Sequence, residues 1–135
     1  AVDLKEIENG ELQKARNVRL LKGDIAGEAV REQIAGRAPF DLIVCDAAPD
    51  TTGNRTVDCG RSFTLVTAII SMFLPFLREG GDFVVKVFQG GGETEILDLL
   101  RPSFSKVKGL KPKASRDNSF EIFYVAAGKI SSSSA

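Results

Sequence analysis

The segment FDLIVCD, residues 40–46, is a nearly unbroken apolar run that ends in an aspartate. Such a run is typical of a strand that is covered on both faces of a sheet. A second segment of the same kind, DFVVKVF, occupies residues 82–88, and a long apolar stretch with helical character, residues 61–78, lies between the two. We therefore expect two parallel strands joined by a crossover helix.

Further strands and helices are predicted on either side of this pair. Strands are expected at residues 1–4, 18–21, 107–110 and 120–127, and helices at residues 26–35 and 93–104. The alternation of strands and helices predicts an α/β fold, with a mostly parallel sheet and helices on both of its faces. The last two strands are joined by the short loop 111–119, which has no room for a helix, so this final pair should be antiparallel.

Composition limits the class of protein. The chain has 135 residues, of which 43% are hydrophobic, and this suits one domain, expected over residues 1–130 with a solvated tail at 131–135. Lys and Arg number 18, as do Asp and Glu, so no overall positive charge attracts nucleic acid, although a local basic patch remains open. Histidine is absent and Cys45 and Cys59 are the only cysteines, which argues against His-based catalysis and against a metal site.

No targeting or membrane-spanning segment is expected. The N-terminal sequence AVDLKEIENG is charged from the start, unlike a signal peptide. The longest apolar stretch, residues 63–77, is interrupted by polar residues and a proline and is predicted to be too short for a bilayer. These features favour a cytoplasmic protein that does not contact a membrane.

Three aspartates are expected where predicted strands end: Asp3, Asp24 and Asp46. Right-handed crossovers bring the carboxyl ends of parallel strands to one rim of the sheet, where ligands bind in such folds. Carboxylates there can accept hydrogen bonds from ribose hydroxyls and an exocyclic amine, which points to a nucleoside-containing ligand. Any single one of them is also explained as a helix cap or a turn former.

Two charged residues interrupt apolar strands. Lys86 lies within DFVVKVF, and because an unpaired buried ammonium is costly, we expect it to reach the open rim or to pair with Asp46 at the end of the preceding strand. Glu121, the only charged residue of FEIFYVAA, would lie beside Lys86 and complete an acid–lysine–acid cluster. The alternatives are a purely structural ion pair for Lys86 and an outward-facing position on an edge strand for Glu121.

Several segments together resemble one family, the FtsJ/RrmJ family of S-adenosylmethionine-dependent RNA 2′-O-ribose methyltransferases. They are VDLKEI (2–7), LKGDI (21–25), FDLIVCDAAPDTTGNRTVD (40–58), GGDFVVKVFQG (80–90), KPKASR (111–116) and FEIFYVA (120–126). The resemblance implies a Rossmann-like methyltransferase fold and S-adenosylmethionine as cofactor, with RNA, most of all large-subunit ribosomal RNA, as substrate. It also implies roles for single residues. Asp3 would bind the cofactor ribose, and Asp24 with Ile25 would bind the adenine. Asp46 would lie near the methionine end and the reaction centre, and would be catalytic together with Lys86 and Glu121.

The chain departs from this family's pattern at its N-terminus. It lacks the family's first strand, its glycine-rich loop and a further lysine, so the sheet is expected to be incomplete and to need a second polypeptide or further residues. Four alternatives stay open. They are a transfer-RNA methyltransferase of the same family, a non-catalytic fragment that binds RNA or a partner, a signalling receiver domain with Asp46 as phosphate acceptor, and one half of a dinucleotide oxidoreductase.

Overall fold

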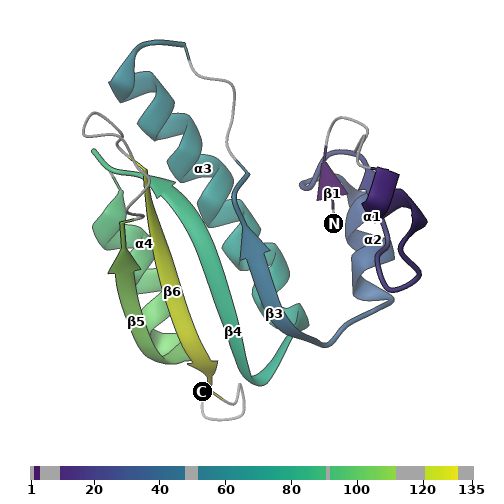
Figure 1. Cartoon of the computed structure of the whole chain (residues 1–135). Coiled ribbons are helices and arrows are strands. Elements are labelled where there is room, and N and C mark those ends of the chain that lie inside the picture. Colours follow the sequence, from purple (N-terminus) through teal and green to yellow (C-terminus); the bar gives the residue numbers. More distant parts are fainter. Residues whose placement is uncertain (1, 4–9, 48–51, 91, 112–120, 131–135) are drawn as a thin grey trace. The chain divides into compact units, whose positions relative to one another are not determined.

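The computed structural model describes residues 2–3, 10–47, 52–90, 92–111 and 121–130 (Figure 1). The chain divides into two compact units, Ala1–Ala38 and Pro39–Ala135. Each unit combines strands with helices, as the α/β prediction requires. The two units are described separately below.

The first unit contains a small parallel pair of strands. Strand β1 (Val2–Asp3) pairs in parallel with β2 (Leu21–Lys22), and the connection between them contains helix α1 (Gly10–Lys14). Helix α2 (Glu28–Ala35) follows β2 and buries Val30. Parallel pairing places the ends of β1 and β2, and hence the positions that follow them, at the same end of this pair.

The second unit is a four-stranded mixed sheet with the order β3-β4-β6-β5. Strands β3 (Phe40–Cys45) and β4 (Leu77–Phe88) run parallel and are joined by helix α3 (Arg55–Phe73) and a short 3-10 helix. Strand β6 (Glu121–Lys129) is antiparallel to β4 and also to β5 (Phe104–Leu110). The expected parallel pair and the expected antiparallel final pair are both confirmed.

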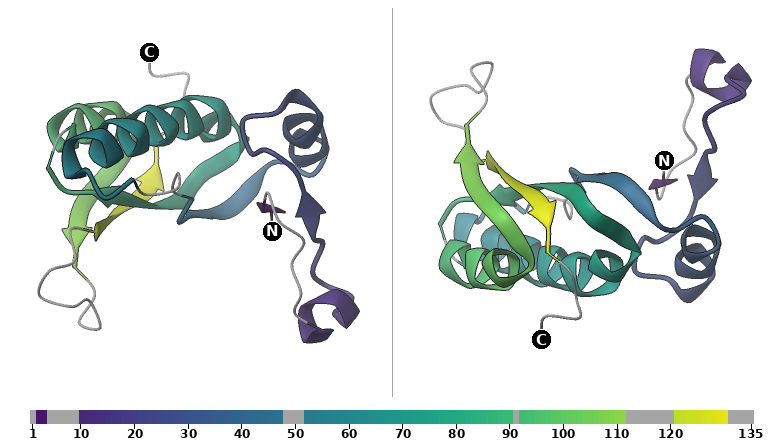
Figure 2. Two further views of the ribbon diagram at one scale, coloured as in Figure 1. Left: turned by 90° about the horizontal axis from the view of Figure 1, so that it is seen from above. Right: turned by 90° about the horizontal axis from the view of Figure 1, so that it is seen from below.

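The core of this unit lies between one face of the sheet and two helices. Helices α3 and α4 (Glu93–Leu100) lie on the same side of the sheet in both views of Figure 2. Alternate residues of β4 and β6 point toward them, and these side chains are almost fully buried. The most buried large side chains are Phe83, Ile69, Ile70, Ile96, Leu100, Val66, Val85 and Val87.

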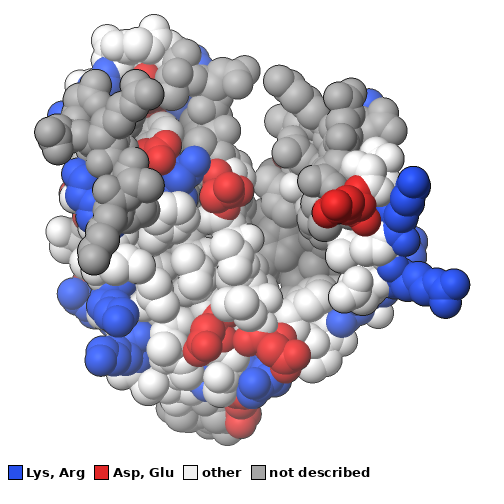
Figure 3. All heavy atoms as spheres, in the orientation of Figure 1, with Lys and Arg blue, Asp and Glu red and all other residues white. Residues whose placement is uncertain are grey.

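The opposite face of the sheet, here called the outer face, differs from the prediction of helices on both faces. No described helix of residues 39–135 covers it (Figure 2), and Leu42 and Val44 of β3 are 53% and 61% exposed. Figure 3 shows uncharged side chains over the middle of β3, β4 and β6 on this face, with charged side chains toward both ends and Lys and Arg gathered over β5. An apolar run that predicts a doubly covered strand is therefore covered on one face only within these residues.

Helix α3 and strand β4 both begin earlier in the chain than predicted. The helix starts at Arg55 rather than at residue 61, because the Asn54 side chain caps it by accepting a hydrogen bond from the Val57 backbone N–H (3.2 Å). Strand β4 starts at Leu77 rather than at residue 82, and it includes Gly80 and Gly81 next to a shift in the β3–β4 register. Helix α3 ends at Phe73, directly before a 3-10 turn that contains Pro75.

The apolar stretch predicted to be too short for a bilayer lies in a longer helical segment, Arg55–Phe76. This segment of 22 residues is long and apolar enough to span a membrane by length and composition alone. The core helix of a soluble protein meets the same criterion, and the side of α3 that faces the sheet is buried. The helix is longer than the apolar stretch on which the prediction was based, because it begins at Arg55, and one of its sides packs against the sheet.

Candidate functional site at the ends of strands β3 and β4

Asp46 and Lys86 lie next to each other in the β3–β4 register. The parallel pairing aligns Val44 with Val84 and Cys45 with Val85, so the following position places Asp46 beside Lys86. By strand alternation both belong to the outer face. The sequence-based expectation that these two residues share one edge of the sheet is consistent with this register.

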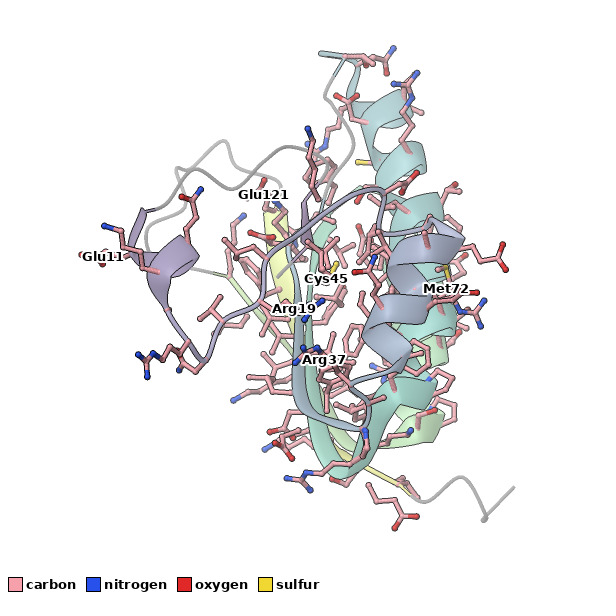
Figure 4. The ribbon with its side chains drawn as sticks, turned by 90° about the vertical axis from the view of Figure 1, so that its right-hand side faces the viewer. Glu11, Arg19, Arg37, Cys45, Met72 and Glu121 are labelled. Atoms are coloured by element: carbon pink, nitrogen blue, oxygen red, sulfur yellow. The ribbon has the colours of Figure 1, made fainter. Side chains whose placement is uncertain are left out.

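The side chain of Lys86 pairs with Glu121. Lys86 Nζ lies 3.6 Å from Glu121 Oε1, and the two side chains are 17% and 41% exposed, respectively. The antiparallel register aligns Phe88 with Glu121 and Lys86 with Phe123, so the pair is a diagonal contact between neighbouring strands. The expected proximity of Glu121 to Lys86 is therefore found, and Figure 4 shows Glu121 at the end where β6 begins.

The expected ion pair between Lys86 and Asp46 is not found among the described residues. The ion pair within 4.0 Å that the structure gives Lys86 is the one with Glu121. Asp46 is exposed and lies one residue beyond the end of β3. Its carboxylate is thus open to solvent or ligand, whereas the carboxylate that neutralises the lysine comes from β6.

Cys45, directly before Asp46, is a buried free cysteine on the α3 side of the sheet (Figure 4). Burial raises the pKa of its thiol and the neighbouring Asp46 charge adds to this, while a hydrogen bond from the Ala47 N–H and the Lys86 charge act in the opposite direction. The net pKa is raised, so the thiol stays protonated at neutral pH. A buried, protonated thiol of this kind packs as a small apolar side chain and is a poor nucleophile.

The other predicted site residues, Asp3, Asp24 and Ile25, belong to the first unit. Asp3 ends β1, and nothing is described of its side chain. Asp24 is exposed just beyond β2, and its Oδ1 accepts a hydrogen bond from the Ala26 N–H (2.9 Å) in the turn that leads to α2. The turn-forming role that the sequence left open for Asp24 is therefore present. The Asp24 carboxylate is thus fixed by the turn and is still exposed near the end of β2.

Sequence reasoning missed the residues of the first turn of α3. Asp58, which precedes the helical stretch expected from residue 61, lies in this turn and is only 3% exposed. Its Oδ1 accepts hydrogen bonds from the Thr52 N–H (2.7 Å) and the Thr52 hydroxyl (2.8 Å). The signal that could have located this turn is Asn54, a favoured N-cap residue, directly before the helix.

Comparison with solved structures defines the class of fold. A Plasmodium falciparum protein described as a ribosomal RNA methyltransferase superposes with a TM-score of 0.76 at 23% identity, over 95% of this chain and 70% of that one. Human methyltransferase-like protein 13, solved in complex with SAH, superposes with a TM-score of 0.60 at 15% identity, over 88% of this chain and 55% of that one. The fold is the Rossmann-like α/β fold of methyltransferases.

The sequence assigns the chain to one family within this class. The model of the FtsJ-like methyltransferase family matches residues 1–129, and the chain belongs to that family. The ribosomal RNA large subunit methyltransferase E of Borrelia duttonii is 44% identical over 126 residues, which are 93% of this chain and 64% of the relative. The protein of the same name from Treponema pallidum is also 44% identical, over 93% of this chain and 62% of the relative. The chain thus spans somewhat less than two thirds of the length of these curated relatives.

Proposed function

We propose that the chain forms part of an enzyme that transfers a methyl group from S-adenosylmethionine to a ribose 2′-hydroxyl in large-subunit ribosomal RNA. The observation that carries this proposal is the Lys86–Glu121 pair, with Asp46 in the adjacent register position, at the rim of an FtsJ-family sheet. The relatives are named as methyltransferases of this RNA.

Lys86 is the proposed catalytic residue. A ribose hydroxyl is a weak nucleophile until its lone pair is oriented and its proton removed. The mostly covered side chain of Lys86 would donate a hydrogen bond to the hydroxyl oxygen and hold it in line with the methyl group. As the C–O bond formed and the C–S bond of the donor broke, the hydroxyl proton would pass to a nearby carboxylate or to water. Glu121 holds the Lys86 side chain, and the exposed Asp46 faces the donor.

The residues of the first unit fit the proposed cofactor. When bound, S-adenosylmethionine supplies an electrophilic methyl group on a sulfonium centre. Asp3 ends β1, Asp24 lies two residues beyond β2, and these two strands pair in parallel. The Asp24 carboxylate is exposed and is held by the Ala26 N–H in the turn after β2. We propose that Asp3 binds the ribose hydroxyls and that Asp24, with the adjacent half-buried Ile25, binds the adenine.

We also propose that the outer face of the sheet is covered in the working enzyme by polypeptide beyond residues 1–135. Among the described strands, β3 pairs with β4 alone, and Leu42 and Val44 are more than half exposed. The curated relatives are longer than the part that this chain matches. One strand along β3, followed by a helix over Leu42 and Val44, would satisfy both the open backbone edge and the apolar surface.

The function is tested with ribosomal large subunits that lack ribose methylation. Purified protein is incubated with these particles and S-adenosylmethionine that carries a labelled methyl group. Label in the RNA, together with a phosphodiester that resists alkaline cleavage at the modified position, supports 2′-O-methylation, because alkaline cleavage needs a free 2′-hydroxyl. Label on a base, or transfer to transfer RNA but not to the large subunit, would contradict the proposed product or substrate.

A pair of lysine variants tests the site. Lys86→Met removes the amine and keeps most of the side-chain volume, and we expect turnover to fall by about 10²–10⁴-fold. Lys14→Met, at an exposed position of α1, is the matched control and should leave turnover unchanged. Normal turnover by Lys86→Met would remove Lys86 from the mechanism.

A further inference from the structure

The first turn of α3 contacts the two segments that continue from the carboxyl ends of β3 and β4. In Figure 1 this turn lies at the end of the sheet to which the arrowheads of β3 and β4 point. Asp46 and Lys86, the proposed site residues of these strands, lie at the same end. The contacts of this turn therefore bear on how the site is held.

Asp58 anchors Thr52, which lies six residues after Asp46 in the sequence. Its Oδ1 accepts the Thr52 N–H at 2.7 Å and the Thr52 hydroxyl at 2.8 Å, and the same hydroxyl oxygen accepts the Asn54 N–H at 3.2 Å. Asp58 is 3% exposed, so its carboxylate is committed to these donors rather than to water. Hydrogen bonds to an ionised acceptor are stronger than those between neutral groups, and thus Thr52 is firmly tied to α3.

Helix α3 also binds the backbone of Gln89, three residues after Lys86. The Arg55 guanidinium (Nη2, 3.2 Å) and the Cys59 thiol (Sγ, 3.4 Å) both donate to the backbone carbonyl of Gln89, the residue directly after β4. Arg55 and Cys59 are one helical turn apart and therefore lie on one side of α3. Residue 89 is only three positions beyond Lys86, so this grip is close to the proposed catalytic residue.

The backbone that follows β4 also packs closely against α3. Gly90 has a φ of +126°, and a Cβ there would lie 3.2 Å from Cys59 Sγ. Gly92 has a φ of +88°, and a Cβ there would overlap the ring of Phe63. Phe63 continues the side of α3 formed by Arg55 and Cys59, and only glycine permits this approach.

We propose that Asp58 is a positioning residue of the methyltransferase site. By binding Thr52 to the helix that also holds Gln89, Asp58 ties these two residues to a common support. We expect this support to limit how far Asp46 and Lys86, six and three positions earlier in the chain, move relative to each other when a ligand binds. The catalytic consequence rests on the proposed function, whereas the anchoring of Thr52 does not.

Amide hydrogen exchange in the full chain tests the anchoring. In the wild type the Thr52 amide is protected by Asp58, and in Asp58→Ala it should exchange about 10-fold faster or more, while the amides of the buried strand residues Phe83 and Val85 change less than Thr52. Asp58→Asn, which keeps an oxygen acceptor, should restore most of the protection. Thr52→Val removes only the hydroxyl contact and serves if Asp58→Ala does not fold. Unchanged exchange of the Thr52 amide in Asp58→Ala, or of the amide of residue 52 in Thr52→Val where Asp58→Ala does not fold, would overturn the proposal.

Kinetics separate a positioning role from a merely structural one. Asp58→Ala should lower kcat by about 10-fold or more, because a small misplacement of reacting groups slows transfer, while KM for S-adenosylmethionine stays within about 3-fold. Asp58→Asn should recover most of kcat, and Asp98→Asn, at an exposed position of α4, should behave as wild type. A rise in KM with kcat unchanged would overturn the positioning role. If the wild type transfers no methyl group, the proposed function fails, and the exchange experiment alone decides whether Asp58 holds Thr52.

Discussion

Lys86 Nζ lies 3.6 Å from Glu121 Oε1, across the antiparallel junction of β4 and β6. The lysine is the more deeply covered partner, at 17% exposure against 41% for the glutamate. A covered ammonium needs a nearby carboxylate, and in this chain that carboxylate comes from the last strand rather than from Asp46. The exposed Asp46 is thereby left available to face a ligand.

We predict that Glu121→Gln lowers methyl transfer but hardly changes stability. Because Glu121 is well exposed and the pair is screened by water, its loss should change the free energy of unfolding by no more than about 1 kcal/mol. Turnover should fall by about 10-fold, because the Lys86 amine loses the group that holds it. Urea denaturation and an initial-rate assay on the same preparation check the two parts. A large loss of stability with full turnover would assign the pair a structural role only.

We predict that side-chain truncations on the two faces of the sheet differ in how much they lower the free energy of unfolding. Phe83→Ala removes a side chain that is 0% exposed between the sheet and the helices, and should lower the free energy of unfolding by about 3–5 kcal/mol. Val44→Ala removes one that is 61% exposed on the outer face, and should change it by no more than about 0.5 kcal/mol. Urea unfolding curves of both variants provide the measurement. A comparable loss for Val44→Ala would mean that the outer face is already packed in this chain.

The stability that Asp58 provides should depend on pH. The pKa of the Asp58 carboxyl lies below its ordinary value of 3.8. The largest cause is the hydrogen bond from the Thr52 N–H, and the Thr52 hydroxyl, the Gly53 N–H and the Arg61 charge add to it, whereas burial acts in the opposite direction. The unfolded chain therefore binds a proton at Asp58 more readily than the folded chain. It follows that the contribution is fully present above about pH 5 and disappears as the pH falls through the folded pKa.

Comparison with Asp58→Asn isolates this effect, because the amide does not titrate. The difference in urea midpoint between wild type and variant should be constant from about pH 5 to pH 8 and should shrink below about pH 4. Asp98→Asn, which alters an exposed acid of α4, is the control for the general effect of losing one negative charge. A difference that grows on acidification would show that the folded pKa is raised rather than lowered.

The sequence predicted most of the second unit because its strands carry strong patterns. The apolar runs around Cys45 and Val85 determine the parallel pair, and the short connection before Glu121 determines the antiparallel one. The same patterns predicted that Glu121 lies beside Lys86, as the structure shows. They succeeded because burial of one strand face and the geometry of short connections are local consequences of sequence.

Two features depended on information that local patterns do not contain. Whether a strand is covered on one face or both depends on which other elements are present, and thus Leu42 and Val44 are exposed although their run predicts full burial. The partner of Lys86 was assigned to Asp46 from strand order, whereas the choice between two nearby carboxylates depends on side-chain direction. The start of α3 was missed because Asn54 and Asp58 lie in a polar stretch that resembles a loop.

We predict that two glycines that contact α3 or belong to it respond to alanine in opposite ways. Gly60 lies on the exposed side of the helix, and a Cβ added there would meet no atom within 4 Å, so Gly60→Ala should raise the free energy of unfolding by about 0.5–1 kcal/mol through helix propensity. Gly92→Ala should lower it by about 1–3 kcal/mol, because its φ of +88° is unfavourable for alanine. The new methyl group would also collide with the Phe63 ring.

A double-mutant cycle separates the two costs at Gly92. Phe63→Ala removes the collision but not the unfavourable φ, so the combined variant should be more stable than the sum of the single changes predicts, by about 0.5–3 kcal/mol. Urea midpoints of the four proteins give this coupling energy. Strict additivity would mean that the ring moves aside freely, and that α3 holds the segment after β4 through Arg55 and Cys59 rather than through the contact of Phe63 with Gly92.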